Sequence, residues 1–142
     1  MINIIEETVL HLKQTGISTF GLLATEGTVF SRAYEKVCNR LGVTCIVPNE
    51  DEQRRISSII YDDIKRNRPV ELSEFLEIAA SMQKRGCERL ILGCTELSLL
   101  KKQLPSDTLF VDSLEVLAYR TILACNKTPI GFDASFSKEA IQ

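Results

Sequence analysis

The chain has 142 residues, of which 44% are hydrophobic and 25% charged, and its formal net charge at pH 7 is −2. This length and composition are ordinary for one globular domain with a sizeable core. The lysines and arginines are scattered, which argues against a surface for nucleic acid or for an anionic membrane, and no apolar run is long enough to span a bilayer.

Apolar residues recur at helical spacing near the start of the chain and predict a helix over residues 2–15, ended by Gly16. The apolar run 18–24 predicts a buried strand. A helix is expected over 28–41, and a second short strand over 43–48. The remaining elements alternate in the same way, with helices over 50–66, 71–85, 96–104 and 113–125 and strands over 88–93 and 108–112.

The predicted strands are continuous apolar runs, and helices separate them. This pattern is typical of parallel strands that are buried on both faces of a sheet, because the connecting helices cover those faces. We therefore predict an α/β fold with a four-stranded parallel sheet and helices on both sides. In such sheets a ligand binds beyond the carboxyl ends of the strands. The loops expected at that edge are "ATEGT", "PNEDE", "GCTE" and "DS".

The loop "ATEGT" could hold an anion. Gly27 permits a tight turn, Thr25 and Thr28 offer hydroxyl groups, and free N–H groups at the start of a helix favour a carboxylate or a phosphate. A plain strand-to-helix turn with a threonine cap explains the same residues. The segment has neither a G-x-G-x-x-G nor a P-loop pattern, so the sequence implies no nucleotide.

The loop "GCTE" places Cys94 at a strand's carboxyl end and at a helix N-terminus, where the helix dipole lowers the pKa of a thiol. Gly93 allows a close approach of backbone or ligand. Thr95 can cap the helix or hold a substrate group. The charge of Glu96 opposes thiolate formation at Cys94. A buried thiol without chemistry remains the alternative interpretation of Cys94.

The other candidate residues favour structural interpretations. The chain has one histidine and no C-x-x-C pair, so it predicts no metal site. His11 is expected to be solvated on a charged helix, and Asp112 with Ser113 to cap a helix. Residues expected on a solvated face are Asp51, Glu52, Arg54 and Arg55. The cysteines expected to be structural are Cys38, Cys45, Cys87 and Cys125.

"MINII" runs directly into two glutamates and does not resemble a signal peptide. With no secretory signal expected, the odd number of cysteines is typical of free thiols in a reducing cytoplasm. We therefore expect a cytoplasmic protein.

Three segments together resemble the aspartate/glutamate racemase family, closest to its aspartate racemase branch. They are "GLLATEGTVFSRAY", "LILGCTELSLL" and "FVDSLEVLA". "INIIEETV" resembles the helix before the second half of those enzymes. The resemblance implies the second half only, with a linking helix over 1–16, an α/β half-domain over 17–126 and an irregular tail over 127–142. It also implies either a shortened gene product or part of a longer protein.

The resemblance implies a reaction without pyridoxal phosphate and without a metal. One cysteine thiolate removes the α-proton of an amino acid, and a second thiol returns a proton on the opposite face. By this resemblance Cys94 is one of the two cysteines. Glu96 stands where the glutamate-type branch has histidine, which points to aspartate or a broader range. The residues implied to bind substrate are Thr25, Gly27, Thr28, Thr95 and Glu96.

The family's first half carries its cysteine in a "C-N-T" motif, which this chain lacks; "CNR" and "CNK" do not replace it. The first hypothesis is therefore a cofactor-independent racemase for a small amino acid or dicarboxylate, completed by a partner chain, with a homodimer expected. The alternative is a non-catalytic carboxylate-binding or interaction module. A third reading is one-sided protonation by a single thiol, as in decarboxylases that resemble this family.

Overall fold

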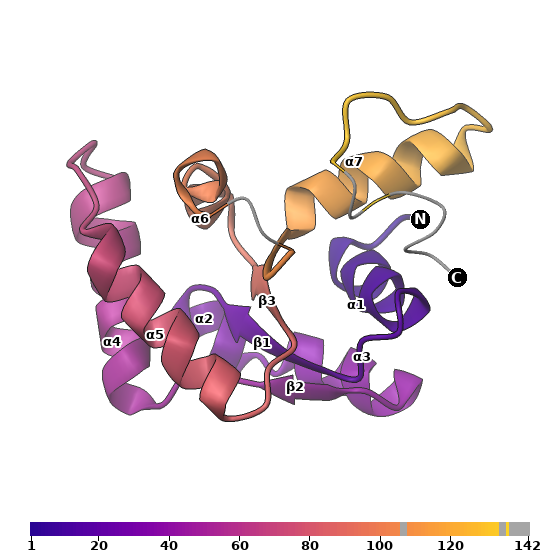
Figure 1. The fold of residues 1–142 in the computed structure, drawn as a ribbon. Helices are drawn as coiled ribbons and strands as arrows, with labels where there is room; N and C mark the ends of the chain where they lie inside the picture. The colour runs from indigo at the N-terminus through magenta and orange to yellow at the C-terminus, as the bar shows by residue number, and fades with distance from the viewer. Residues whose placement is uncertain (106–107, 134–135, 137–142) are drawn as a thin grey trace.

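The computed structural model describes residues 1–105, 108–133 and 136 (Figure 1). The elements are α1 (Ile4–Gln14), β1 (Thr19–Leu23), α2 (Glu26–Phe30), α3 (Ala33–Leu41), β2 (Thr44–Ile46), α4 (Glu50–Ser58), the π-helix η1 (Ile59–Ile64), α5 (Leu72–Lys84), β3 (Arg89–Leu92), α6 (Thr95–Ser98), the 3-10 helix η2 (Lys101–Gln103), β4 (Phe110–Asp112) and α7 (Ser113–Ala124).

The four strands form one parallel sheet in the order β2-β1-β3-β4. The predicted α/β fold with a four-stranded parallel sheet is confirmed. Its two central strands, β1 and β3, pair with Leu23 opposite Leu92. Because all strands run the same way, their carboxyl ends lie at one edge, where the segments after β1, β2, β3 and β4 begin.

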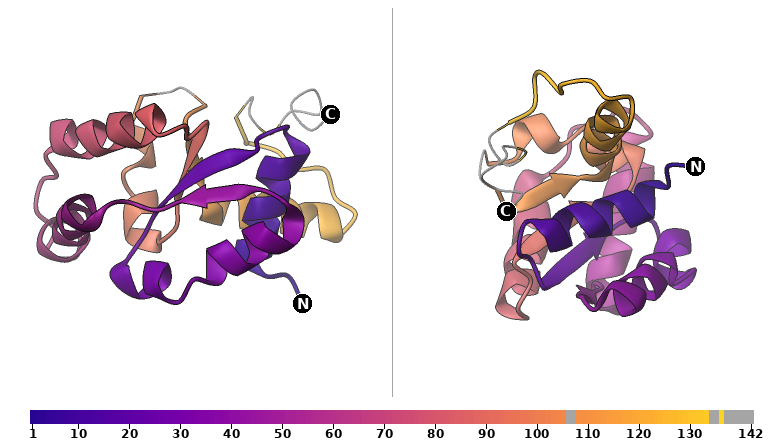
Figure 2. Two further views of the ribbon diagram at one scale, coloured as in Figure 1. Left: turned by 90° about the horizontal axis from the view of Figure 1, so that it is seen from below. Right: turned by 90° about the vertical axis from the view of Figure 1, so that its right-hand side faces the viewer.

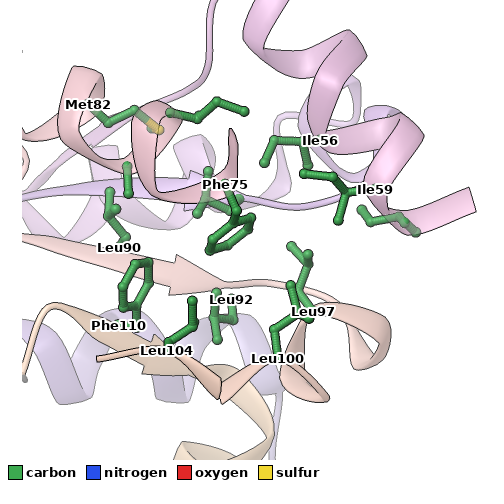
Figure 3. Close-up of a cluster of buried hydrophobic side chains, with 14 of the residues drawn as sticks. Ile56, Ile59, Phe75, Met82, Leu90, Leu92, Leu97, Leu100, Leu104 and Phe110 are labelled. Atoms are coloured by element: carbon green, nitrogen blue, oxygen red, sulfur yellow. The ribbon is translucent and has the colours of Figure 1, made fainter. Parts of the chain in front are cut away.

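Alternate side chains of the strands enter two separate hydrophobic clusters, as expected for the two faces of a pleated sheet. Leu90 and Leu92 of β3 pack with Phe75 of α5 and Ile56 of α4 on one face (Figure 3). Ile91 lies in the other cluster, which joins the sheet to α1 and α3. Burial on both faces explains why the strands read as continuous apolar runs.

Helices α1 and α7 pack against each other on the second face (Figures 1 and 2). Their contact includes an ion pair in which Arg120 Nε donates to Glu7 Oε2 at 2.6 Å. Phe132 and Phe136 fold back onto Tyr119 of α7. Part of the predicted irregular tail, residues 134–135 and 137–142, lies outside the described residues.

The prediction of a solvated His11 is wrong, because the imidazole is only 4% exposed. Its ring stacks on Phe136 with 5.0 Å between ring centroids and meets Tyr119 edge-on. Burial, with a smaller contribution from the Arg120 charge, lowers the pKa of His11 to about 4. The ring that covers His11 is Phe136, from the C-terminal tail. The charged residues around His11 in α1 gave no sign of this contact.

Glu52 also departs from the predicted solvated face, since it is buried. It forms a reciprocal capping box with Asn49 at the start of α4 and accepts hydrogen bonds from Ser81 Oγ at 2.6 Å and Arg85 Nη2 at 2.5 Å. Burial opposes the charge of Glu52, but these bonds outweigh it and lower the pKa of the carboxyl group. Glu52 therefore ties α4 to α5.

Three predicted helices have a different form in the structure. The helix over 28–41 is two helices, because Arg32 takes a left-handed conformation (φ 56°) between α2 and α3. The helix over 50–66 continues from α4 into the π-helix η1. The helix over 96–104 comprises the single turn α6 and then η2. Apolar spacing marks the buried stripe but does not reveal such local changes.

Candidate active site

Cys94 lies at the carboxyl end of β3, immediately before α6. The Gly93 N–H donates to Leu23 O at 2.8 Å and so carries the β1–β3 pairing one residue beyond the strand. Cys94 is the N-cap of α6 with an extended backbone, and its thiol is half-buried and forms no cap hydrogen bond. Leu97 and Leu100 anchor the following turn in the core (Figure 3). The structure therefore confirms the predicted position of Cys94 between a strand and a helix.

Gly93 is required at this position by close packing. A Cβ atom on Gly93 would lie 2.8 Å from Leu22 Cδ1, 3.2 Å from Ala24 Cβ and 3.3 Å from Leu23 O. Real Cβ atoms are rarely found so close to a neighbouring group. The glycine therefore lets the segments that leave β1 and β3 pass close together. Continuing the strand register brings Thr25 opposite Cys94.

The electrostatics of Cys94 differ from the expectation that the helix start would lower its pKa. Burial is the largest effect and raises the pKa of the Cys94 thiol to about 11. Backbone N–H groups of Leu97 and Glu96 act in the opposite direction, and the Glu96 carboxylate adds to the increase, as the sequence indicated. The free site therefore holds a protonated thiol at neutral pH.

Glu96 and Thr95 interact with each other next to Cys94. Thr95 Oγ1 donates to Glu96 Oε2 at 3.1 Å, so its hydroxyl does not cap α6. Lys65 Nζ lies 3.5 Å from Glu96 Oε1 and 4.6 Å from the centre of the Tyr61 ring. Backbone hydrogen bonding lowers the pKa of Glu96, and so do Thr95 and Lys65, so the carboxylate is charged.

Lys65 is a residue that sequence reasoning missed. It directly follows η1, which is distant in sequence from "GCTE". In the sequence it is only a charged residue near the end of a predicted helix. The π-helix changes the helical register just before Lys65, and such segments are frequent at functional sites.

Thr25 and Thr28 lie together after β1. Thr25 is the N-cap of α2, where its Oγ1 accepts from the Thr28 N–H at 3.3 Å, and the two hydroxyl oxygens are 3.0 Å apart. The helix therefore begins two residues before the predicted Thr28. Gly27 lies inside α2, without a left-handed φ, and no atom would come within 4 Å of an added Cβ. The structure shows the strand-to-helix turn with a threonine cap and does not use the tight turn that Gly27 would permit; open space adjoins Gly27.

Residues of the segments that follow β2 and β4 brace this edge. Asp112 Oδ1 accepts from the Leu114 N–H at 2.9 Å, which confirms the predicted cap, and from Ser98 Oγ at 2.7 Å. Ser113 Oγ donates to Leu92 O at 2.9 Å. Gln53 of α4 donates from Nε2 to Ala24 O at 3.0 Å. These bonds fix the turns on both sides of Cys94.

The other cysteines lie away from this edge. Cys38 is buried in α3 beside Cys45 of β2, and Cys87 is buried before the amino end of β3. Cys125 caps the end of α7 and is exposed, so it is not the buried residue expected of a structural cysteine. All five cysteines lie in the described part of the chain, and Cys94 alone lies at the carboxyl edge of the sheet.

Within residues 1–105, 108–133 and 136, no group of three or more histidine, cysteine, aspartate or glutamate residues is arranged to hold a metal ion. No helix in this part of the chain is long and apolar enough to cross a membrane.

Comparison with known proteins gives consistent results. The model of the Asp/Glu/hydantoin racemase family matches residues 1–121. An uncharacterised protein from the pnlA 3′ region of Pectobacterium carotovorum subsp. carotovorum is 31% identical over 124 residues, which are 86% of this chain and 83% of that protein. The glutamate racemase of Shewanella loihica is 30% identical over 108 residues, which are 72% of this chain but 39% of the enzyme.

A solved aspartate racemase homologue from Pyrococcus horikoshii OT3 superposes with a TM-score of 0.77 at 27% identity. The superposition covers 89% of this chain and 57% of that structure. The chain therefore spans about half the length of the larger proteins that it resembles, while it spans most of the Pectobacterium protein.

Proposed function

The chain belongs to the Asp/Glu/hydantoin racemase family, and from this premise we propose that Cys94 acts as an acid/base thiol at the α-carbon of a small amino acid. The observation that carries the proposal is the half-buried Cys94 thiol at the carboxyl edge of the sheet, at the end of a strand that pairs with β1, whose following loop carries the Thr25 and Thr28 hydroxyls. Aspartate and glutamate are the proposed substrates, as the names of the relatives suggest.

In this proposal the substrate binds between the β1 and β3 loops. The Thr25 and Thr28 hydroxyls, of which one donates to the other, and the backbone at Gly27, where no atom would lie within 4 Å of an added Cβ, hold its carboxylate. Thr95 and Glu96 hold the substrate beside Cys94, where Glu96 can accept a hydrogen bond from its ammonium group. The proton passes between the Cys94 sulfur and the α-carbon, and no cofactor takes part.

Racemisation requires that a proton leaves one face of the α-carbon and arrives on the other. Cys94 can serve one face, and no second cysteine of this chain lies at that edge. We therefore propose that a partner chain supplies the second acid/base group, in a homodimer.

A second candidate is a carboxylate-binding module without turnover. The raised pKa of Cys94, about 11, favours it, because little thiolate is present at neutral pH. Thiolate is needed to remove an α-proton, whereas binding a carboxylate needs only the hydroxyl and N–H donors.

Exchange of the α-proton in D2O separates these candidates. The purified chain is incubated with L- or D-aspartate and L- or D-glutamate, and the α-proton signal is followed by NMR while chiral chromatography follows inversion. The proposal predicts exchange that Cys94→Ala abolishes and Cys125→Ser leaves unchanged. Binding without exchange would support the module instead. Exchange that survives Cys94→Ala would overturn the role of Cys94.

A further inference from the structure

A cavity outside the candidate active site lies along the outer edge of β4. In the described part of the chain, β4 pairs with β3 alone and is therefore an edge strand of the sheet. The volume of the cavity is about 270 Å³, and Cys94 does not line it. Its walls come from α1, from β4 and from the first turn of α7, and the polar residues that line it include His11, Arg89, Lys101, Asp112 and Glu115. Since ligand pockets usually exceed about 300 Å³, this cavity suits a molecule smaller than a nucleotide.

His11 brings an unused hydrogen-bonding group to this cavity. The residue is 4% exposed, and no residue in the described part of the chain forms a hydrogen bond with its imidazole. The ring stacks on Phe136, which also lines the cavity. Burial lowers the pKa of His11 to about 4, so the imidazole is neutral at pH 7 and has one N–H donor and one acceptor nitrogen. A polar side chain that is almost fully buried and has no partner favours a polar ligand in the cavity beside it.

Arg89 supplies a positive charge at the amino end of this edge. It begins β3, just before Leu90, which pairs with Phe110 of β4. Its Nη1 donates to Glu88 O at 2.7 Å, and the guanidinium forms no ion pair with a described residue. The Glu88 carboxylate is bound instead by Ser18 Oγ at 3.0 Å. Because a guanidinium has five N–H donors, Arg89 keeps donors for the carboxylate of a ligand.

Carboxylates gather at the carboxyl end of the same edge. Glu115 lies in the first turn of α7, and Lys101 Nζ is 3.7 Å from its Oε2 while it donates to Phe110 O at 2.6 Å. Burial raises the pKa of Glu115, Lys101 lowers it, and the charges of Asp112 and Asp133 raise it further. The negative charge of these two neighbours beside Glu115 favours a ligand cation at this end.

We propose that this cavity binds a small zwitterion whose ammonium and carboxylate groups are several bonds apart, with the carboxylate at Arg89, the ammonium group at Glu115 and a hydrogen bond to the His11 imidazole. Opposite charges at the two ends fix the direction of the ligand, because a reversed zwitterion would place like charges together. β4 has three residues, so the edge between these ends is about 10 Å long. An ω-amino acid therefore fits better than an α-amino acid. This site is independent of the acid/base role proposed for Cys94.

The imidazole of His11 is a direct probe of the cavity, because the chain has one histidine. Proton NMR at pH 7 follows the His11 Hε1 signal while 4-aminobutyrate or 6-aminohexanoate is added to the full chain, with butyrate and butylamine as single-charge controls. We expect both ω-amino acids to shift the signal in a saturable way, with a Kd at least about tenfold lower than that of either control, since charge-assisted hydrogen bonds form at both ends. A signal that neither ω-amino acid shifts, or that all four compounds shift equally, would overturn the inference.

Two variants test the two ends of the cavity separately. Arg89→Gln should weaken binding of the ω-amino acids about tenfold and leave butylamine unchanged, whereas Glu115→Gln should weaken the ω-amino acids and leave butyrate unchanged. The matched control is Lys84→Gln, which removes an exposed charge from the end of α5. Circular dichroism checks that each variant is folded. Equal losses for the zwitterions and the single-charge compounds would mean a general structural effect and would reject the assigned ends.

Backbone amide signals separate this cavity from the candidate active site. In an isotope-labelled chain, a zwitterion bound in the cavity should shift the amides of Thr15 and Val111, which line it, more than those of Thr28 and Thr95. Shifts confined to Thr28 and Thr95 would place the ligand beside Cys94 and overturn the inference. Cys94→Ala should bind the ω-amino acids as the wild type does, so this result stands or falls without regard to the proposed acid/base role.

Discussion

Lys65 Nζ lies 3.5 Å from Glu96 Oε1, and the two residues come from η1's end and from α6, thirty-one positions apart in the chain. The pair stands next to Cys94, whose thiol pKa is raised partly by the Glu96 charge. The Lys65 charge therefore offsets the Glu96 carboxylate, which opposes a thiolate at Cys94. Because Lys65 directly follows η1, the π-helix places this charge near Cys94.

Opposite substitutions in this pair should move the thiol in opposite directions. Glu96→Gln removes a negative charge and should lower the pKa of Cys94, whereas Lys65→Met leaves Glu96 unopposed and should raise it. A partly exposed ion pair is worth about 0.2–1 kcal/mol, so each shift should stay below about one pKa unit. Mass spectrometry of iodoacetamide alkylation at Cys94, as a function of pH, measures both shifts. Shifts of the same sign would show that the pair acts through structure and not through charge.

The thiol itself should titrate far above neutrality in the free protein. With a pKa of about 11, the thiolate fraction of Cys94 rises about tenfold for each pH unit between pH 7 and pH 10. The alkylation rate at Cys94 should rise in proportion, and exposed Cys125 provides an internal comparison in the same digest. A rate at Cys94 that levels off below about pH 9 would contradict the raised pKa.

Two glycines at the site should respond differently to the same methyl group. In Gly93→Ala the new Cβ would lie 2.8 Å from Leu22 Cδ1, within the packed core, and overpacking of this kind costs about 1–3 kcal/mol. In Gly27→Ala the methyl group enters open space inside α2, where alanine is favoured over glycine by up to about 1 kcal/mol. Urea unfolding should therefore show Gly93→Ala destabilised and Gly27→Ala unchanged or stabilised.

The Gly27→Ala variant also tests where the substrate binds. If a carboxylate binds against the backbone at Gly27, the methyl group of Gly27→Ala should weaken aspartate or glutamate binding, although the fold is as stable as before. Calorimetric titration measures this affinity. An unchanged affinity would place the substrate elsewhere at this edge.

The fold was predictable because its information is local and repeated. Continuous apolar runs such as 88–93 reveal a strand buried on both faces, and the alternation of Leu90, Ile91 and Leu92 between two clusters is the physical basis of that signal. The position of Cys94 followed from the same pattern, since the end of a strand and the start of a helix are visible in the sequence.

Other features depend on contacts between distant segments, and the sequence did not reveal them. Lys65 meets Glu96 only after η1, which follows β2 and α4, comes together with α6, which follows β3, and His11 is covered by Phe136 from the far end of the chain. The raised pKa of Cys94 belongs to the same class. The start of a helix predicts a lowered pKa for the Cys94 thiol, but burial by packed neighbours is the larger effect and raises that pKa.

His11 should make the stability of the protein depend on pH. Its pKa is about 4 in the folded chain and 6.5 in the unfolded chain, so the unfolded state binds more protons between these values. The contribution of the neutral imidazole is therefore fully present above pH 6.5 and is lost as the pH falls toward 4, by about 2 kcal/mol at pH 5.

His11→Phe keeps an aromatic ring against Phe136 but cannot titrate. Urea unfolding of both proteins at pH 7.5 and pH 5 isolates this contribution, because the carboxylates titrate equally in each. We expect the wild type to lose about 2 kcal/mol more than His11→Phe over this interval. An equal loss in the two proteins would mean that His11 titrates normally in the folded state and that its burial against α7 and Phe136 is not maintained in solution.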